Sequence, residues 1–366
     1  MLTRRLLPLL AFLAVPDAAL AQQPVPPPAP AFQPAPPAAD AFDWIQFNSG
    51  EWLKGELIAL YDGVLEFESD QLDAMSIDWE DVRRVRTARV FRVLFVRQPP
   101  VTGRLVVEGD TVRVIGSSGE ERRFARSALL TIAGGEQSEW RNWSGKITLG
   151  ANLRSGNTSQ TELNGDVRAT RRTVRTRVGL SFLGNYNITN DVTATDNQRA
   201  NLEADWFLTD RWFVRPVEAE YFRDPFQNIT SRLRFGAALG YQLVSGARID
   251  WDVSAGPAYE QTDYQSVLAG EPDPDGAFAA SVHTIYTNEL TSRIDYRFDY
   301  GFRLTEPEAG QYSHHLVTGF SLDAVAFVDL DVSVVWDRVQ QPRPDASGIV
   351  PKRDDLRFIF GLGFEF

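Results

Sequence analysis

The sequence predicts an all-β protein: a transmembrane antiparallel β-barrel of about 12 strands, preceded by a small β domain made of two repeats. Three observations predict this fold class. Residues 143–366 form successive segments in which apolar and polar side chains alternate, which is the period of a strand with two unlike faces. These segments run 11 to 18 residues, whereas strands of soluble sheets average about five or six. Short turns alternate with longer loops, as is typical of outer-membrane barrels.

Residues 1–21 predict a secretory signal peptide. Arg4 and Arg5 precede an apolar run that is too short to span a bilayer, and Ala19-Leu20-Ala21 offers a cleavage site. The chain has no Cys, which excludes a lipoprotein anchor, a disulfide and a thiolate site. Residues 22–40 hold eight of the 21 prolines, and we expect them to form an extended linker.

Residues 41–135 contain one pattern of short strands twice. The segment Gly55-Glu56-Leu57 recurs as Gly103-Arg104-Leu105, 48 residues later, and each copy ends in a Ser- or Asp-containing stretch that favours one helical turn. We therefore expect a tandem of two small SH3-like or Sm-like barrels. Such a module either packs on itself and the following domain or contacts a periplasmic protein or peptidoglycan.

The barrel region, 143–366, divides into twelve strands. They are predicted at 143–154, 158–170, 173–188, 195–208, 211–223, 228–244, 247–264, 278–289, 291–304, 312–325, 328–340 and 354–366. Tight turns are expected at 171–172, 209–210 and 245–246, and longer loops at 189–194, 265–277, 305–311 and 341–353. The eighth strand alternates weakly, so a barrel of ten strands remains open.

The last strand carries the clearest pattern. From Leu356 to Phe366 every second residue is large and apolar, which in a closed barrel indicates a face turned to lipid. An even strand count places both ends of the barrel in the periplasm, where residues 41–135 must then lie. Two girdles of aromatic side chains are expected at the membrane surfaces. Their members are Trp206, Phe213, Tyr241 and Trp251 near the tight turns, and Tyr186, Tyr221, Tyr259 and Trp336 near the long loops.

One position in the fifth strand contradicts strict alternation. Arg215 falls on the lipid face if Phe213 and Val217 do, and Pro216 cannot donate a hydrogen bond to a neighbouring strand. A bulge near Pro216 would resolve both conflicts.

The opposite faces of the strands are rich in charge and are expected to line the lumen. The candidate lumen-lining residues are Arg175, Arg177, Arg232, Arg234, Asp250, Asp252, Arg293, Asp295, Arg297, Asp299 and Arg303. Such residues either form an ion-pair lattice that fills the barrel or line a narrow diffusion channel for small solutes. The formal net charge of −12 argues against a nucleic-acid partner.

Nothing in the sequence indicates an enzyme, a cofactor or a metal site. The three histidines are His283, His314 and His315, and we expect those of the pair to be solvated at the end of a loop. An outer-membrane lipid hydrolase would need a Ser and a His on one face of the wall. Adjacent strand residues point to opposite faces, so Ser313 and His314 cannot provide that arrangement.

The first barrel hairpin contains Ser155-Gly156-Asn157-Thr158, and the last strand ends in Phe366. In both features the chain resembles the YdiY-like family of salt-induced outer membrane proteins, whose longer members carry a similar paired N-terminal module. The resemblance implies a Gram-negative outer-membrane barrel, in contact with outer-membrane lipid, with a structural or stress-related role under osmotic or salt stress. It brings no binding or catalytic residues. We expect a monomer.

Overall fold

The computed structural model describes residues 42–366 except 70, 135–138, 156–158, 272, 274 and 326–327. The predicted signal peptide and linker, and most of the turn that carries the family resemblance, lie outside the described residues. The described part is all-β, with short 3-10 turns between some strands. None of its helical segments is long and apolar enough to cross a membrane.

The N-terminal domain consists of ten strands and two 3-10 turns. They are β1 (Asp43–Phe47), β2 (Trp52–Tyr61), β3 (Val64–Ser69), β4 (Asp73–Asp78), η1 (Trp79–Asp81), β5 (Val82–Arg86), β6 (Phe91–Phe95), β7 (Val101–Glu108), β8 (Thr111–Ile115), β9 (Glu121–Ala125), η2 (Arg126–Ala128) and β10 (Leu129–Gly134). The second copy repeats the first element by element, since β1–β5 with η1 correspond to β6–β10 with η2. The internal repeat predicted from the sequence is therefore present in the structure.

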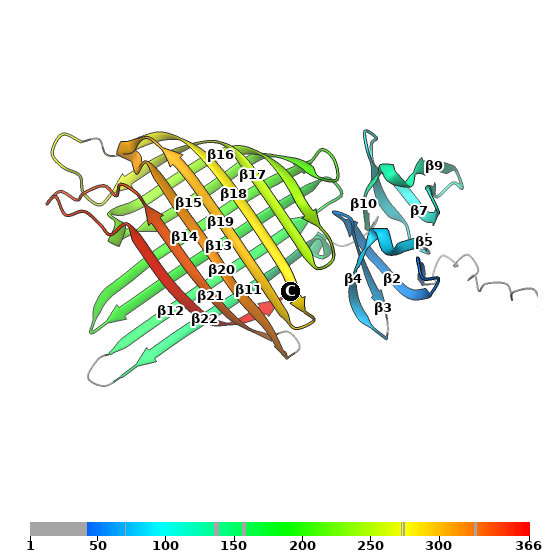
Figure 1. Cartoon of the computed structure of the whole chain (residues 1–366), viewed down its shortest axis with the longest axis horizontal. Helices are drawn as coiled ribbons and strands as arrows, with labels where there is room; N and C mark the ends of the chain where they lie inside the picture. Colours follow the sequence, from blue (N-terminus) through cyan, green and yellow to red (C-terminus); the bar gives the residue numbers. More distant parts are fainter. Residues whose placement is uncertain are drawn as a thin grey trace, which may run out of the picture. The chain divides into compact units, whose positions relative to one another are not determined.

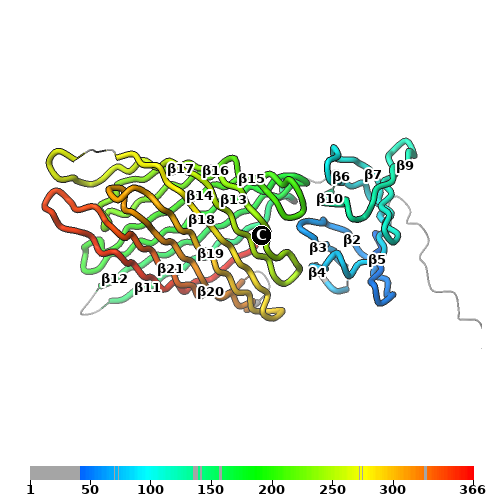
Figure 2. The backbone as a smooth tube through the Cα atoms, turned by 45° about the horizontal axis from the view of Figure 1, so that its top comes forward, coloured from blue at the N-terminus to red at the C-terminus, as the bar shows by residue number. Residues whose placement is uncertain are grey.

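The two copies do not form two separate barrels, which corrects that expectation. Strands β1, β5, β7, β6, β10 and β2 pair in a closed ring of six, three from each copy, because β1 also pairs with β2. The remaining hairpin strands extend this ring, β3 and β4 from β2, and β8 and β9 from β7 (Figures 1 and 2). Strand β5 of the first copy pairs with β7 of the second, and β10 of the second with β2 of the first.

One continuous core explains why the copies fuse. Leu57 and its counterpart Leu105 are both fully buried in a single cluster, which also contains Phe67, Phe91 and Ile132. Full burial of such a side chain contributes about 1.5–3 kcal/mol, so a copy that lost its partner would lose much of its stabilisation.

The barrel has twelve strands and closes on itself. They are β11 (Trp143–Arg154), β12 (Gln160–Arg172), β13 (Thr176–Thr189), β14 (Val192–Phe207), β15 (Trp212–Asp224), β16 (Ile229–Ser245), β17 (Ile249–Tyr264), β18 (Asp275–Thr291), β19 (Ile294–Thr305), β20 (Tyr312–Val325), β21 (Val328–Val339) and β22 (Asp354–Glu365). Short 3-10 turns lie at η3 (Glu139–Asn142), η4 (Pro225–Gln227) and η5 (Pro307–Ala309). The count is twelve, not ten, because the weakly alternating eighth segment is the full-length strand β18.

The last strand closes the barrel by pairing with the first. Lys146 lies opposite Glu365 and Leu149 opposite Leu362, and Gly145 and Phe366 exchange two backbone hydrogen bonds of 2.9 and 3.0 Å. All neighbouring strands are antiparallel, and the strands of the two walls cross in projection, as expected for tilted strands (Figure 1).

Connection lengths differ between the two ends of the barrel. At the end that contains Trp143, the connections span 173–175, 208–211, 246–248 and 292–293. At the other end they span 155–159, 190–191, 225–228, 265–274, 306–311 and 340–353. Two expectations are corrected. The turn placed at Arg171 and Arg172 lies at 173–175, and the long loop expected at 189–194 is a two-residue turn. Asn190 and Asp191 both have positive φ, 50° and 63°, as a tight hairpin turn requires.

A bulge is present at Pro216, and it resolves the two conflicts noted in the sequence. The register between β15 and β16 shifts between Arg215 and Glu218. The register between β14 and β15 shifts between Ala204 and Trp206. Arg215 therefore points inward and is 3% exposed. Phe213 also points inward and is fully buried, which corrects its assignment to an aromatic girdle.

Candidate functional site in the barrel lumen

The barrel has an inverted distribution of polarity, which makes its lumen the candidate site. Every one of the twelve strands exposes at least one large apolar side chain, including Leu163, Leu202 and Phe360. The buried side chains are largely polar or charged, among them Asp205 and Arg303. A water-soluble sandwich has the opposite arrangement, with charge outside and apolar side chains within.

Aromatic rings form ladders at two levels of the outer face. Near the short turns, Tyr286 contacts Trp251 and Tyr296, with ring centroids 6.0 and 6.1 Å apart. Near the longer loops, His314 stacks on Trp336 at 5.4 Å. The ladders agree with the two predicted girdles, in which Trp251 and Trp336 were named.

Two cavities lie inside the barrel. The larger has a volume of about 490 Å³ and extends to Gln227 in the connection between β15 and β16. The smaller, about 370 Å³, includes Lys146 and Arg248 at the opposite end. Six residues line both cavities, so the two adjoin: Asp166, Arg168, Asp250, Thr287, Arg297 and Val317. Volumes of this size hold many water molecules.

The structure brings together nine of the eleven candidate lumen-lining residues. Those that line one or both cavities are Arg177, Arg232, Arg234, Asp250, Asp252, Asp295, Arg297, Asp299 and Arg303. The other two lie in connections: Arg175 between β12 and β13, and Arg293 between β18 and β19.

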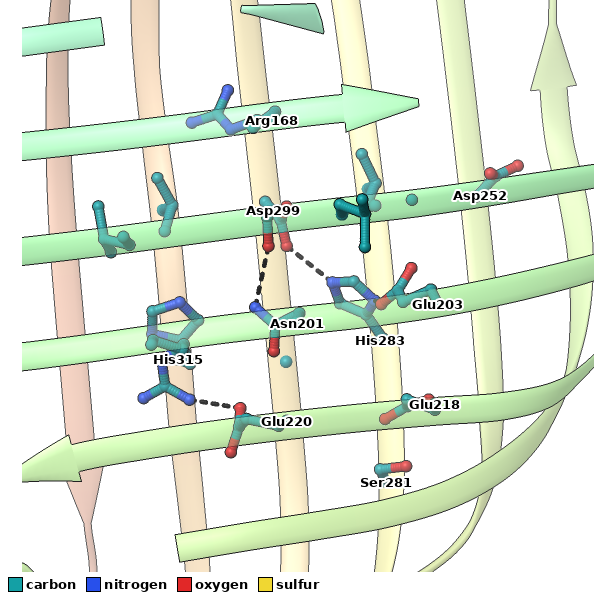
Figure 3. Close-up of a pocket in the computed structure, with 18 of the residues that line it drawn as sticks. Arg168, Asn201, Glu203, Glu218, Glu220, Asp252, Ser281, His283, Asp299 and His315 are labelled. Atoms are coloured by element: carbon teal, nitrogen blue, oxygen red, sulfur yellow. Dashed lines mark hydrogen bonds and ion pairs between the residues drawn. The ribbon is translucent and has the colours of Figure 1, made fainter. Parts of the chain in front are cut away.

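His283 is the centre of one group of lumenal charges. Its Nε2 lies 2.7 Å from Asp299 and its Nδ1 lies 3.3 Å from Glu203. Figure 3 shows the ring and Asp299 turned towards one another, with Glu203 beside them. Arg297 reaches the second oxygen of Asp299 at 2.7 Å, and Arg215 reaches Glu203 at 3.0 Å. Each carboxylate in this group therefore has two cationic or imidazole partners.

Asp337 is the centre of a second group. It accepts hydrogen bonds from Arg199 at 2.9 Å and from Arg357, and its Oδ1 lies 2.8 Å from His315 Nδ1. Arg199 also donates to Glu220 at 2.5 Å. All these side chains are mostly buried. Removing one partner would leave the remaining buried charges only partly compensated, and breaking a buried ion pair costs up to roughly 3–5 kcal/mol.

Several of these contacts cross the lumen. Arg199 is on β14 and Asp337 on β21, five places apart in the ring of twelve strands. Contacts between strands four places apart join Arg177 to Asp252 at 2.6 Å and Glu203 to His283. Side chains on opposite walls therefore meet, and they narrow the lumen.

An apolar cluster also lies inside the barrel. Leu183, Val335 and Ile359 are buried against one another, with Val317 packed beside them. Val317 lines both cavities, so this cluster borders the region where they adjoin. The alternating pattern did not reveal it, because Ile359 and Val335 resemble lipid-facing residues in composition.

The histidines are not solvated at a loop, which corrects that expectation. His315 points into the lumen, where it contacts Asp337. His314 points outward and forms a 2.7 Å hydrogen bond with Tyr300. Ser313 is two residues before His315 in the same strand and shares its inner face, so Ser313 and His314 lie on opposite faces, as the strand period predicts.

Several lumenal charges are absent from the candidate residues named from the sequence: Arg199 and Asp205, and also Asp337 and Arg357, which lie on the polar faces of their strands. Asp205 and Arg215 form a pair with a 2.7 Å hydrogen bond. The bulge interrupts the alternation of faces, so a strict period of two does not place both side chains in the lumen. Arg357 alternates with the apolar residues of the last strand, and that signal could have identified it.

The outer connections are tied to one another across the mouth with the longer loops. Asn228 donates to the carbonyl oxygens of Ser266 at 2.9 Å and Pro344 at 3.2 Å. Arg343 forms ion pairs with Glu271 at 3.0 Å and Asp275 at 2.7 Å. These contacts join the connection 225–228 and the described segment 265–271 to residues 343–344.

A family described as "Protein of unknown function, DUF481" matches residues 147–366. Among solved structures, the NanC porin is 13% identical over 61% of this chain and 100% of that chain, with a TM-score of 0.37. The outer membrane channel DcaP of Acinetobacter baumannii is 13% identical over 89% of this chain and 94% of that one, with a TM-score of 0.30. The CymD monoaromatic hydrocarbon channel is 8% identical over 75% and 86%, with a TM-score of 0.27. No curated protein matches the chain.

Proposed function

The chain belongs to the DUF481 family of proteins of unknown function, and we propose that it is a monomeric outer-membrane barrel whose lumen is a narrow, charge-lined path for small polar solutes or ions. The observation that carries this proposal is the pair of adjoining cavities inside the barrel. Apolar side chains exposed on all twelve strands favour lipid as the surrounding medium. Nine of the charged residues singled out from the sequence would line this path.

We also propose a periplasmic location for residues 41–135. Both ends of a barrel with an even number of strands lie on one side of the membrane, and short connections are typical of the periplasmic side. A contact of this domain with a periplasmic protein or peptidoglycan belongs to the same proposal.

The contacts that cross the lumen favour a second candidate function. If they hold the lumen closed, the barrel is a structural element of the outer membrane, and the YdiY-like resemblance suggests a role in osmotic or salt stress. The hydrolase alternative lacks support from the pair Ser313 and His314, because the two are adjacent in a strand and lie on opposite faces of the wall.

Planar-bilayer conductance separates the two candidates. We expect the purified full chain to give steady ohmic steps. The double variant Arg199→Gln, Asp337→Asn removes a contact between opposite walls without removing bulk, and we expect it to give larger steps. Arg223→Gln is the matched control, because Arg223 pairs with Asp196 and lines neither cavity. A correctly inserted barrel that gives no steps in the wild type or the double variant would establish the structural candidate instead.

A further inference from the structure

One cationic side chain in the lumen has no anionic partner within ion-pair distance among the described residues. Arg232, on β16, is 6% exposed and lines the larger cavity. Among the residues that the structure describes, none forms a hydrogen bond or ion pair with its guanidinium, and its Nε is buried without an acceptor. The contact it makes is with the ring of Phe222, whose centroid lies 4.8 Å away. A cation–π contact is a weak substitute for an oxyanion, because a guanidinium presents five N–H donors in a planar fork.

The neighbouring arginines share their carboxylates with one another. Glu220 lies 2.5 Å from Arg199, 3.8 Å from Arg234 and 3.9 Å from Arg303. Arg303 also pairs with Glu260 at 2.8 Å, and Arg234 with Glu218 at 3.0 Å. The guanidiniums of Arg199, Arg234 and Arg303 thus share Glu220, whereas no carboxylate of the described residues lies within ion-pair distance of Arg232.

Unused donors gather at the same place. Arg234 and Arg303, like Arg232, have a buried Nε without an acceptor among the described residues, and all three line one cavity. A buried donor left unpaired costs about 1–3 kcal/mol, more when it is charged. A ligand oxygen that accepts from these groups would remove that cost and would give Arg232 an anionic partner.

We propose that Arg232, with Arg234 and Arg303, forms a binding site for a small oxyanion, a carboxylate or phosphate group, in the half of the lumen next to the longer loops. The site lies within the larger cavity, which also reaches Gln227 in the connection between β15 and β16. A guanidinium binds two oxygens of such a group at once, which favours oxyanions over chloride. The inference rests on the proposed function only in that the anion must enter the lumen.

Ligand-dependent thermal stability of the full chain in detergent micelles tests the site without a conductance measurement. The probes are inorganic phosphate and acetate, each titrated against chloride at constant ionic strength. We expect a saturable rise in the unfolding midpoint with at least one of them, because a ligand that binds the folded state stabilises it. A larger rise with phosphate would identify a phosphoryl group as the preferred ligand, and a larger rise with acetate a carboxylate.

Two substitutions make the assignment specific. Arg232→Gln should weaken the apparent affinity about tenfold or more, the loss expected for one charged hydrogen-bonding partner. Arg232→Lys keeps the charge but not the planar fork and should also weaken it, so the test survives if the glutamine variant does not fold. Arg223→Gln, the control outside the cavities, should bind like the wild type.

The site would be overturned if the unfolding midpoint of the wild type showed no saturable rise. It would also be overturned if both Arg232 variants showed the same rise as the wild type. If the chain conducts ions but does not bind these anions, the anion site is refuted and the channel proposal stands. If the chain binds these anions but does not conduct ions, the channel proposal is refuted and the anion site stands.

Discussion

At the scale of single residues, the barrel is organised by the pairing of charges that point inward. Arg215 shows this most clearly, because its backbone would direct it outward if the strand were regular. The bulge at Pro216 turns it inward, where its guanidinium meets Asp205 at 2.7 Å and Glu203 at 3.0 Å. A local irregularity of the strand therefore serves the electrostatics of the lumen.

Arg215→Met keeps most of the side-chain volume and removes the charge. We expect a loss of roughly 3–5 kcal/mol in the free energy of unfolding, because two mostly buried carboxylates lose a partner. Urea unfolding in lipid vesicles measures it. Arg223→Met is the control: its ion pair with Asp196 is partly exposed, and such pairs contribute about 1 kcal/mol or less. Equal losses in the two variants would contradict this account.

At the scale of elements, the last strand shows how a period of two places a barrel in lipid. Phe358, Phe360 and Leu362 point outward, while Arg357 and Ile359 point into the barrel. Pairing of this strand with β11 leaves no open edge, which matters where no water can satisfy backbone groups.

A matched pair of substitutions tests the position of the lipid. Phe360 in β22 and Ile349 in the outer connection are equally exposed, at 66%. Phe360→Arg should cost about 2–4 kcal/mol in vesicles, the value for a charge near the midplane, whereas Ile349→Arg should cost little because that loop lies in water. Equilibrium refolding into vesicles measures both. Similar costs at the two positions would place this face of β22 outside the hydrocarbon.

At the scale of the whole molecule, the N-terminal domain is one folding unit made from two copies of one pattern. Its ring needs three strands from each copy, and its core contains residues of both. The cross-copy pairs β5–β7 and β10–β2 are equivalent, so neither copy can close the ring without the other.

We therefore expect residues 42–86 alone to be unfolded and residues 42–134 to fold. Circular dichroism with thermal melting should show a cooperative transition for the longer fragment and none for the shorter one. If each copy formed an independent barrel, as expected from the sequence, residues 42–86 would fold on their own. A cooperative transition in that fragment would therefore reject the fused ring.

The sequence by itself determined the strand positions, the count of about twelve and the faces of most strands. Each of these depends on a period of two within a short segment, and the order of apolar and polar residues along the chain shows that period directly. The sequence also pointed to the place of the bulge, because Arg215 and Pro216 each conflicted with a regular strand and a bulge would resolve both conflicts. Nine of the eleven candidate residues line the cavities for the same local reason.

Only the tertiary structure decided which charges meet. Arg199 and Asp337 are 138 residues apart in sequence, and their contact depends on the curvature and register of the closed ring. The fusion of the two N-terminal copies likewise depends on strand pairing between them, since each copy alone has the same alternating pattern whether it closes on itself or on its partner. Local period determines which way a side chain points, and closure of the sheet determines what lies opposite it.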